Sequence, residues 1–340
     1  MYVTPRPDAR DDPLYAVRLG LTGALAYLAV AILNPTLPPI IAALPVGLIA
    51  AQRKSFSAMK ALAGPVALIV LVHAMAWLVE FLRPMPAVYI GGMWLTYFAG
   101  FLLILRTGTP VGMLVVIVAV LMSVMGMHGT ATLHAMRDGF VDASLVALVL
   151  GPLVYFLVPP ATSDTHVDDT VPSSGNTTMG AAIRATVLLG LSFWLYSVMQ
   201  PSDMMMAMVA AMVLVFPTRR RVWSEAMQRV RATVYGGGVA LLILGVWVLS
   251  QHLPILLGLI FLSGLFFGDR MLFGPRQSMV YQYAFSVVLA LVAGAISTQD
   301  AAYATFTRIV LTLGGAFTAA FATALLDSAS GWRDRQPEAA

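Results

Sequence analysis

The chain of 340 residues is 59% hydrophobic and only 11% charged, with a mean hydropathy of +0.84. Soluble domains average roughly 45–50% apolar and about 25% charged residues, so this composition argues against a soluble enzyme, a nucleic-acid-binding module and a disordered chain. The formal net charge of +4 is interpreted as loop charge that orients a membrane protein. The absence of cysteine excludes disulfides and thiolate metal sites.

Long apolar runs mark the expected membrane spans in chain order. The first run, Leu19–Gln52, contains no Asp, Glu, Lys or Arg. Asn34 and Pro35 break it in the middle, so it is predicted to form a helical hairpin of two spans, the first of which begins near Tyr15. Four further spans complete the first half: Ala61–Val79, Pro86–Leu105, Pro110–Met127 and Ala143–Val158. Residues 159–179 form a polar linker rich in Pro, Ser, Thr and Asp.

The second half repeats this layout with six more apolar runs. They are Ala181–Met199, Met204–Pro217, Ala232–Ser250, Pro254–Gly268, Ser278–Ile296 and Ile309–Leu326. The sequence therefore predicts an all-α polytopic membrane protein with about 12 transmembrane helices.

The distribution of basic residues orients these spans through the positive-inside rule. With a cytoplasmic N-terminus, all but three of the 20 Lys and Arg residues lie in cytoplasmic segments or their flanks. The three exceptions are Arg83, Arg137 and Arg308. Both terminal tails, residues 1–13 and 328–340, are therefore expected to be cytoplasmic.

The two halves match at a constant offset of 166 residues. Four pairs of landmarks keep this register: Arg18 with Arg184, Asn34-Pro35 with Gln200-Pro201, Arg53-Lys54 with Arg219-Arg220, and Gly108 with Gly274. Because each half has an even number of spans, the offset predicts two parallel six-helix repeats, residues 14–158 and 180–327. Internal duplication of this kind is common among transporters.

The repeated layout resembles that of a known group of proteins. Each half has an Arg at the inner end of its first span (Arg18, Arg184) and a basic loop after its second span (Arg53, Arg219). This pattern is similar to the fusaric acid resistance and aromatic acid exporter family of bacterial inner-membrane proteins, over residues 14–328. The resemblance implies efflux of aromatic carboxylates beside a periplasmic adaptor subunit. Larger members carry a cytoplasmic domain between the two halves, where this chain has only Pro159–Met179.

Four residues are candidates for substrate binding. Arg18, Arg184 and Arg308 could each bind a carboxylate through the guanidinium fork, although an Arg near a helix end also extends to lipid headgroups. Pro45 lies inside the short second span, where it frees backbone groups that a substrate could use. The alternative is that the prolines of this span only tighten the hairpin.

Four other residues are candidates for proton coupling, because ionisable groups at membrane depth are costly and often functional. Asp138 and Asp142 are four residues apart at the expected start of the sixth span, where acids also favour a helix N-terminus for structural reasons. His73 lies in the middle of its span, and Glu80 follows two turns later on the same face. His73 could instead hydrogen-bond a backbone carbonyl.

Together these features predict a secondary transporter of the bacterial inner membrane that exports small organic anions, with coupling to protons. Aromatic substrates follow from the family resemblance. No enzymatic activity, cofactor, metal ion or nucleic-acid partner is expected. A passive channel and a scaffold subunit of an export complex with a periplasmic adaptor remain alternatives, and a homo-oligomer stays open.

Overall fold

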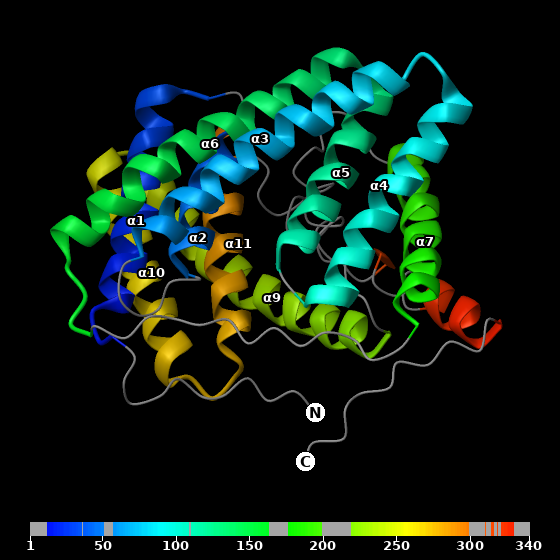
Figure 1. Cartoon of the computed structure of the whole chain (residues 1–340). Helices are drawn as coiled ribbons and strands as arrows, with labels where there is room; N and C mark the ends of the chain where they lie inside the picture. Colours follow the sequence, from blue (N-terminus) through cyan, green and yellow to red (C-terminus); the bar gives the residue numbers. More distant parts are fainter. Residues whose placement is uncertain are drawn as a thin grey trace. The chain divides into compact units, whose positions relative to one another are not determined.

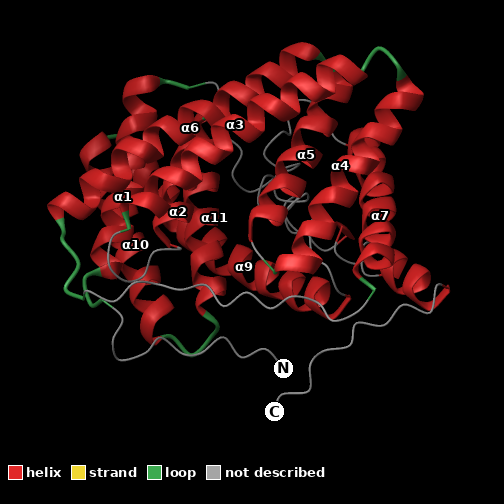
Figure 2. Ribbon diagram, in the orientation of Figure 1, coloured by secondary structure: helices red, strands yellow, loops and turns green. Residues whose placement is uncertain are grey.

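The computed structural model describes residues 12–35, 37–50, 57–108, 110–162, 176–198 and 219–298, together with 310, 314–315, 318 and 321–329. All secondary structure elements in this part of the chain are helices (Figure 2). Nine of the described helices are long and apolar enough to cross a membrane. The chain is therefore the multi-pass helical membrane protein that its composition predicts.

The described helices are labelled in chain order in Figure 1. Their bounds are α1 (Tyr15–Leu33), α2 (Pro38–Ala50), α3 (Ala58–Leu82), α4 (Pro86–Thr107), α5 (Pro110–His128), α6 (Thr130–Leu157), α7 (Thr177–Val198), α9 (Arg219–Leu249), α10 (Leu253–Phe273) and α11 (Ser278–Thr298). The turn that separates α1 from α2 is at Asn34, whose φ of 46° places it in the left-handed region that asparagine tolerates better than most residues. The break predicted at Asn34-Pro35 is thus present.

Helix α2 is too short to cross a bilayer in the usual way. Its 13 residues span about 20 Å at 1.5 Å per residue, whereas the hydrocarbon core is about 30 Å thick. Pro45 lies inside this helix and is buried. The predicted counterpart in the second half, Met204–Pro217, lies outside the described residues.

Two helices begin before the apolar runs that mark their predicted spans. Helix α6 starts at Thr130, ahead of the span predicted from Ala143, and α9 starts at Arg219, ahead of the span predicted from Ala232. The charged residues at these starts end the apolar runs, but they do not end the helices, because no proline interrupts either stretch. Asp138 and Asp142 therefore lie inside α6 and not at its N-terminus, so stabilisation of a helix start does not explain them.

The helices form two compact units, and each is described by itself. Unit 1 comprises Met1–Ile69, Asp138–Val167 and Gln228–Phe306, and unit 2 comprises Val70–Arg137, Asp168–Met227 and Thr307–Ala340. In unit 1, α1 packs along α10 and α2, and α11 contacts both α2 and α10. In unit 2, α4 packs along α7 and α5, and α5 also contacts α7. Neither unit coincides with one half of the sequence, because each takes helices from both halves.

The internal packing of the two units follows the 166-residue offset. Shifted by this offset, α4 gives residues 252–273, which agree with α10, and α5 gives residues 276–294, which agree with the start of α11. The contact of α1 with α10 in unit 1 corresponds to the contact of α7 with α4 in unit 2, and the pair α10 and α11 corresponds to α4 and α5. These contacts are the ones that the 166-residue offset relates, and the repeat itself stays a prediction.

Small residues allow α1 and α10 to approach closely in unit 1. A Cβ atom added at Gly264 would lie 2.5 Å from the Cα atom of Gly20, and one added at Gly268 would lie 2.7 Å from the Cα atom of Ala16. Close helix contact through small residues four apart is a common way to associate helices in membranes, where burial of apolar surface between helices gains little. Buried Ile260 and Phe267 flank this contact on α10.

We predict that Gly264→Ala destabilises the protein by about 1–3 kcal/mol, because the added methyl group overpacks the contact of α10 with α1. The control is Gly258→Ala on the same helix, where a Cβ atom meets nothing within 4 Å. That change should be neutral or stabilising by up to about 1 kcal/mol through helix propensity. Unfolding in detergent micelles measures both effects, and equal stability of the two variants would contradict this packing.

Candidate functional site

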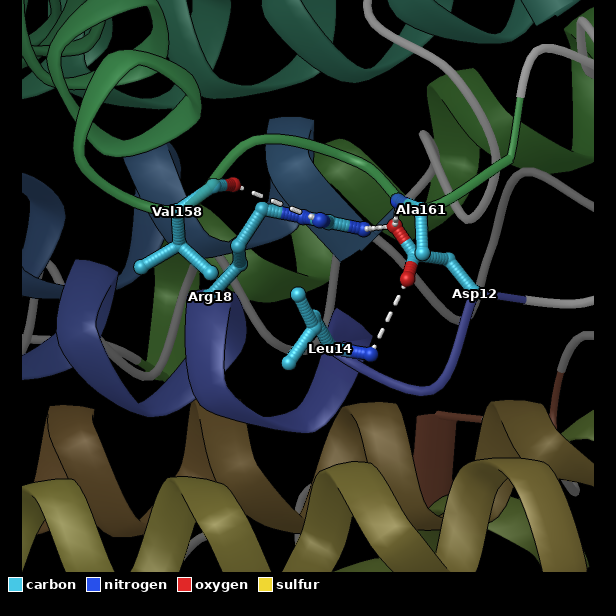
Figure 3. A network of polar contacts seen from close by, with 5 residues as sticks. All are labelled: Asp12, Leu14, Arg18, Val158 and Ala161. Atoms are coloured by element: carbon cyan, nitrogen blue, oxygen red, sulfur yellow. Dashed lines mark hydrogen bonds and ion pairs between the residues drawn. The ribbon is translucent and has the colours of Figure 1, made fainter.

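The predicted substrate residue Arg18 is fully buried near the N-terminal end of α1, in unit 1. Its Nη2 atom donates a hydrogen bond of 2.5 Å to Oδ2 of Asp12, which is also fully buried (Figure 3). The same carboxylate accepts hydrogen bonds from the backbone N–H groups of Leu14, at 3.0 Å, and Ala161, at 3.2 Å. Asp12 thus joins the residues before α1 to those after α6.

The second guanidinium nitrogen of Arg18 extends this connection. Its Nη1 atom donates to the carbonyl oxygen of Val158 at 3.4 Å, and its guanidinium carbon lies 4.8 Å from the ring centroid of Tyr155. The carbonyl groups at a helix C-terminus lack intrahelical partners and carry partial negative charge, so a cation at the end of α6 is favourable. A substrate carboxylate would therefore compete with Asp12 for Arg18.

Arg184 of α7, which lies 166 residues after Arg18, is also buried and paired, in unit 2. Its Nη2 atom lies 3.4 Å from Oδ2 of Asp327, and its Nη1 atom donates to the carbonyl oxygen of Gly180 at 2.9 Å. Under the 166-residue offset Asp327 corresponds to Ala161, whose N–H group belongs to the Arg18 network. Arg184 therefore pairs with Asp327, whereas the equivalent position in unit 1, Ala161, bonds the counter-ion Asp12 and not Arg18 itself.

The structure pairs Glu80 with a histidine that the sequence analysis did not select. Oε1 of Glu80 on α3 hydrogen-bonds Nε2 of His134 on α6, within unit 2. The sequence analysis grouped Glu80 with His73 on the same helix, whereas the partner seen here is His134 on another helix. The His73 side chain is exposed. The predicted order of spans could have suggested His134, because it ends the third span and begins the sixth on the same side of the membrane.

The two aspartates of α6 occupy successive turns of that helix. Asp138 is exposed and Asp142 is half-buried. Within the described part of the chain, no hydrogen bond or ion pair is found for Asp142. An unpaired carboxylate inside an apolar helix is costly when ionised, so Asp142 keeps the chemical features expected of a proton carrier.

The other two predicted substrate residues are placed differently. Pro45 has no backbone N–H, so the carbonyl group of Ile41 one turn earlier in α2 has no intrahelical donor at that position. Arg308 lies outside the described residues. Among the residues that the structure describes, no group of three or more His, Cys, Asp or Glu side chains could hold a metal ion.

Unit 2 also contains a buried set of hydroxyl groups that the sequence analysis missed. The Tyr89 hydroxyl is 2.8 Å from Oγ and 2.9 Å from the carbonyl oxygen of Ser123, which connects α4 to α5. The Tyr97 hydroxyl is 3.1 Å from Oγ of Ser192, which connects α4 to α7. Serine and tyrosine are common in apolar helices, so only the packing of α4, α5 and α7 reveals that they meet.

The C-terminal part of the chain is similar to a known protein family. Residues 191–322 match the model of the fusaric acid resistance protein-like family. The match begins within α7 and includes α9, α10 and α11, and it confirms the family resemblance for this part of the chain. No match is found among curated proteins or among solved structures. A multi-pass membrane protein with a fusaric acid resistance protein-like region is consistent with a membrane transporter.

We predict that Arg18→Met lowers the free energy of unfolding by about 3–5 kcal/mol, because it leaves the buried Asp12 carboxylate without its counter-charge. The double variant Arg18→Met/Asp12→Leu should recover much of this loss, since neither buried charge remains. Arg276→Met, which removes an exposed arginine, is the control and should change stability by no more than about 0.5 kcal/mol. Denaturant titration in micelles measures all three variants; similar stability of Arg18→Met and Arg276→Met would show that the pair is not structurally important.

Proposed function

We propose that the protein is a secondary transporter of the bacterial inner membrane that exports small organic anions, aromatic ones in particular, at the expense of the proton gradient. The observation that carries the proposal is the match of residues 191–322 to the fusaric acid resistance protein-like family in a chain with nine membrane-length apolar helices. Fusaric acid is itself an aromatic carboxylic acid, so the family description favours this substrate class.

The proposed architecture has about 12 spans in two parallel repeats, with both termini in the cytoplasm. Its support comes from the distribution of Lys and Arg and from the equivalent helix contacts inside the two units. Transporters built from repeats bind their substrates between the repeats and use irregular helices there. The short, proline-containing α2 fits that role, with Pro45 next to the pathway.

The anion would be bound by the repeat-related arginines. Arg184 is the better candidate, because its 3.4 Å separation from Asp327 exceeds the 2.7–2.9 Å of a strong charge-assisted hydrogen bond. Arg18 holds its carboxylate more tightly, at 2.5 Å, although its Nε atom has no hydrogen-bond partner among the described residues. Arg308 is retained as a further candidate.

Proton coupling would use a carboxylate at membrane depth. Asp142 is preferred because it lies inside α6 without an ion pair in the described part of the chain, and Asp138 is one turn closer to the predicted outer end. A periplasmic adaptor and a second copy of the chain are proposed partners. In the alternative functions, a passive channel would conduct without a proton gradient, and a scaffold would co-purify with an adaptor without any flux.

We predict that Asp142→Asn abolishes proton-driven efflux, because the amide has nearly the same shape but cannot exchange a proton. The assay measures release of fusaric acid from proteoliposomes under an acidic exterior, corrected for leakage from protein-free liposomes. Asp269→Asn is the matched control, because it makes the same chemical change at an exposed carboxylate, near the C-terminal end of α10. It should retain full efflux.

Three results would contradict parts of this proposal. Undiminished efflux by Asp142→Asn would exclude Asp142 as the proton carrier. Wild-type flux that is independent of the imposed pH gradient would favour a channel. Absence of flux for fusaric acid and for a panel of other aromatic acids would contradict aromatic anion export.

A further inference from the structure

We propose that Glu80 and His134 form a proton-binding site that loads the transporter from the outer side of the membrane. The role in coupling rests on the transport function proposed above, whereas proton binding by the pair does not. Both side chains belong to unit 2, where Oε1 of Glu80 and Nε2 of His134 are joined by a hydrogen bond.

The pair connects two helix ends. Glu80 lies in the last turn of α3, which ends at Leu82, and His134 lies in the second turn of α6, which begins at Thr130. The distribution of Lys and Arg assigns both ends to the outer side. The side chains are 37% and 43% exposed, so protons can reach the pair without a channel through the protein.

Neighbouring contacts hold the two helix ends in place. Gly126 of α5 lies against Val79, and the Leu133 side chain would be 3.9 Å from a Cβ atom at this glycine. Val79 and Leu133 immediately precede Glu80 and His134 in the sequence. The Thr132 hydroxyl also donates to the carbonyl oxygens of Met125, at 2.7 Å, and Gly129, at 2.8 Å. Contacts of α5 with residues next to both partners thus bring the two helix ends together beside the pair.

The chemistry of the pair suits reversible proton binding. Histidine is the side chain whose charge normally changes between pH 5 and 8. When neutral His134 takes up one proton at a ring nitrogen, it becomes an imidazolium beside the Glu80 carboxylate, and the net charge of the pair changes from −1 to 0. The attraction between α3 and α6 then increases, so the bound proton is coupled to the contact between two helices.

Other charged and titratable groups of unit 2 belong to the same helices and to their neighbours. On α3 these are His73 and, just beyond its end, Arg83, and on α6 it is Arg137. His128 ends α5, where its ring lies 4.8 Å from that of Tyr196, and α4 contributes Tyr89.

The alternative is a simple interfacial ion pair that holds α3 to α6. Such a pair would add modest stability, and its removal would not alter how flux responds to pH. If the pair instead couples protons to transport, removal of either partner changes how flux responds to pH, because each partner then controls the charge of the other within the working pH range.

The first test is an NMR titration of the full chain, labelled with ¹⁵N at histidine and held in lipid nanodiscs. The signals that disappear in His134→Gln identify His134 among the five histidines. We expect them to titrate between pH 5 and 8, and the midpoint to move to lower pH in Glu80→Gln, because the carboxylate no longer stabilises the imidazolium. His252→Gln, at an exposed histidine before α10, should leave the midpoint unchanged. No movement in Glu80→Gln would overturn the proton-binding pair.

The second test separates the pair from the transport function. Fusaric acid efflux from proteoliposomes is measured against external pH for the wild type, His134→Gln, Glu80→Gln, and the exchange variant Glu80→His/His134→Glu. We expect both single variants to lose at least tenfold of the gradient-driven rate and the exchange variant, which keeps a histidine–carboxylate pair, to recover most of it. Gradient-driven efflux at the wild-type rate in both single variants would overturn the coupling role while transport stands. A wild-type protein without gradient-driven efflux, but with the expected titration, would overturn the coupling role and the proposed transport, and leave the proton-binding pair intact.

Discussion

The burial of the Arg18 charge is the constraint on which unit 1 depends. Arg18 is fully buried near the start of α1, so water does not solvate its guanidinium, and its charge and hydrogen bonds must be met within the protein. Asp12 supplies the counter-charge, and the carbonyl oxygen of Val158 supplies a further acceptor. Because Asp12 precedes α1 and Val158 follows α6, this single side chain fixes where two distant segments of the sequence meet. In unit 2 Arg184 imposes a similar constraint on the position of Asp327.

Much of the helical layout follows from hydropathy. The predicted runs locate the long helices that the structure describes, including the break at Asn34. The apolar runs do not extend to the starts of α6 and α9, where charged residues lower the hydropathy but leave the backbone helical. Hydropathy reports transfer into lipid, whereas a helix continues until its backbone hydrogen bonding is interrupted, and the 31 residues of α9 extend to about 46 Å, beyond the hydrocarbon core.

The candidate functional residues were easier to select from the sequence than their partners. Arg18, Arg184, Glu80 and Asp142 could be selected from the sequence because charge is rare in these helices. Their partners depend on which helices pack together, and the sequence gives no direct measure of that. His134 lies 54 residues from Glu80, and Val158 lies 140 residues from Arg18. The grouping of Glu80 with His73 used spacing along one helix, which cannot detect a neighbour on another.

The equivalent packing of the two units contrasts with their unequal polar content. In unit 2 the hydroxyls of Tyr89 and Tyr97 bond Ser123 and Ser192, whereas the 166-residue offset places Leu289 and Ala26 at the positions of the two serines. One acceptor persists, because the carbonyl oxygen of Leu289 accepts a hydrogen bond from the Tyr27 hydroxyl as that of Ser123 accepts one from Tyr89. The same offset sets Asp142 against Arg308, a reversal of charge. Backbone packing between helices can thus be retained while polar side chains diverge.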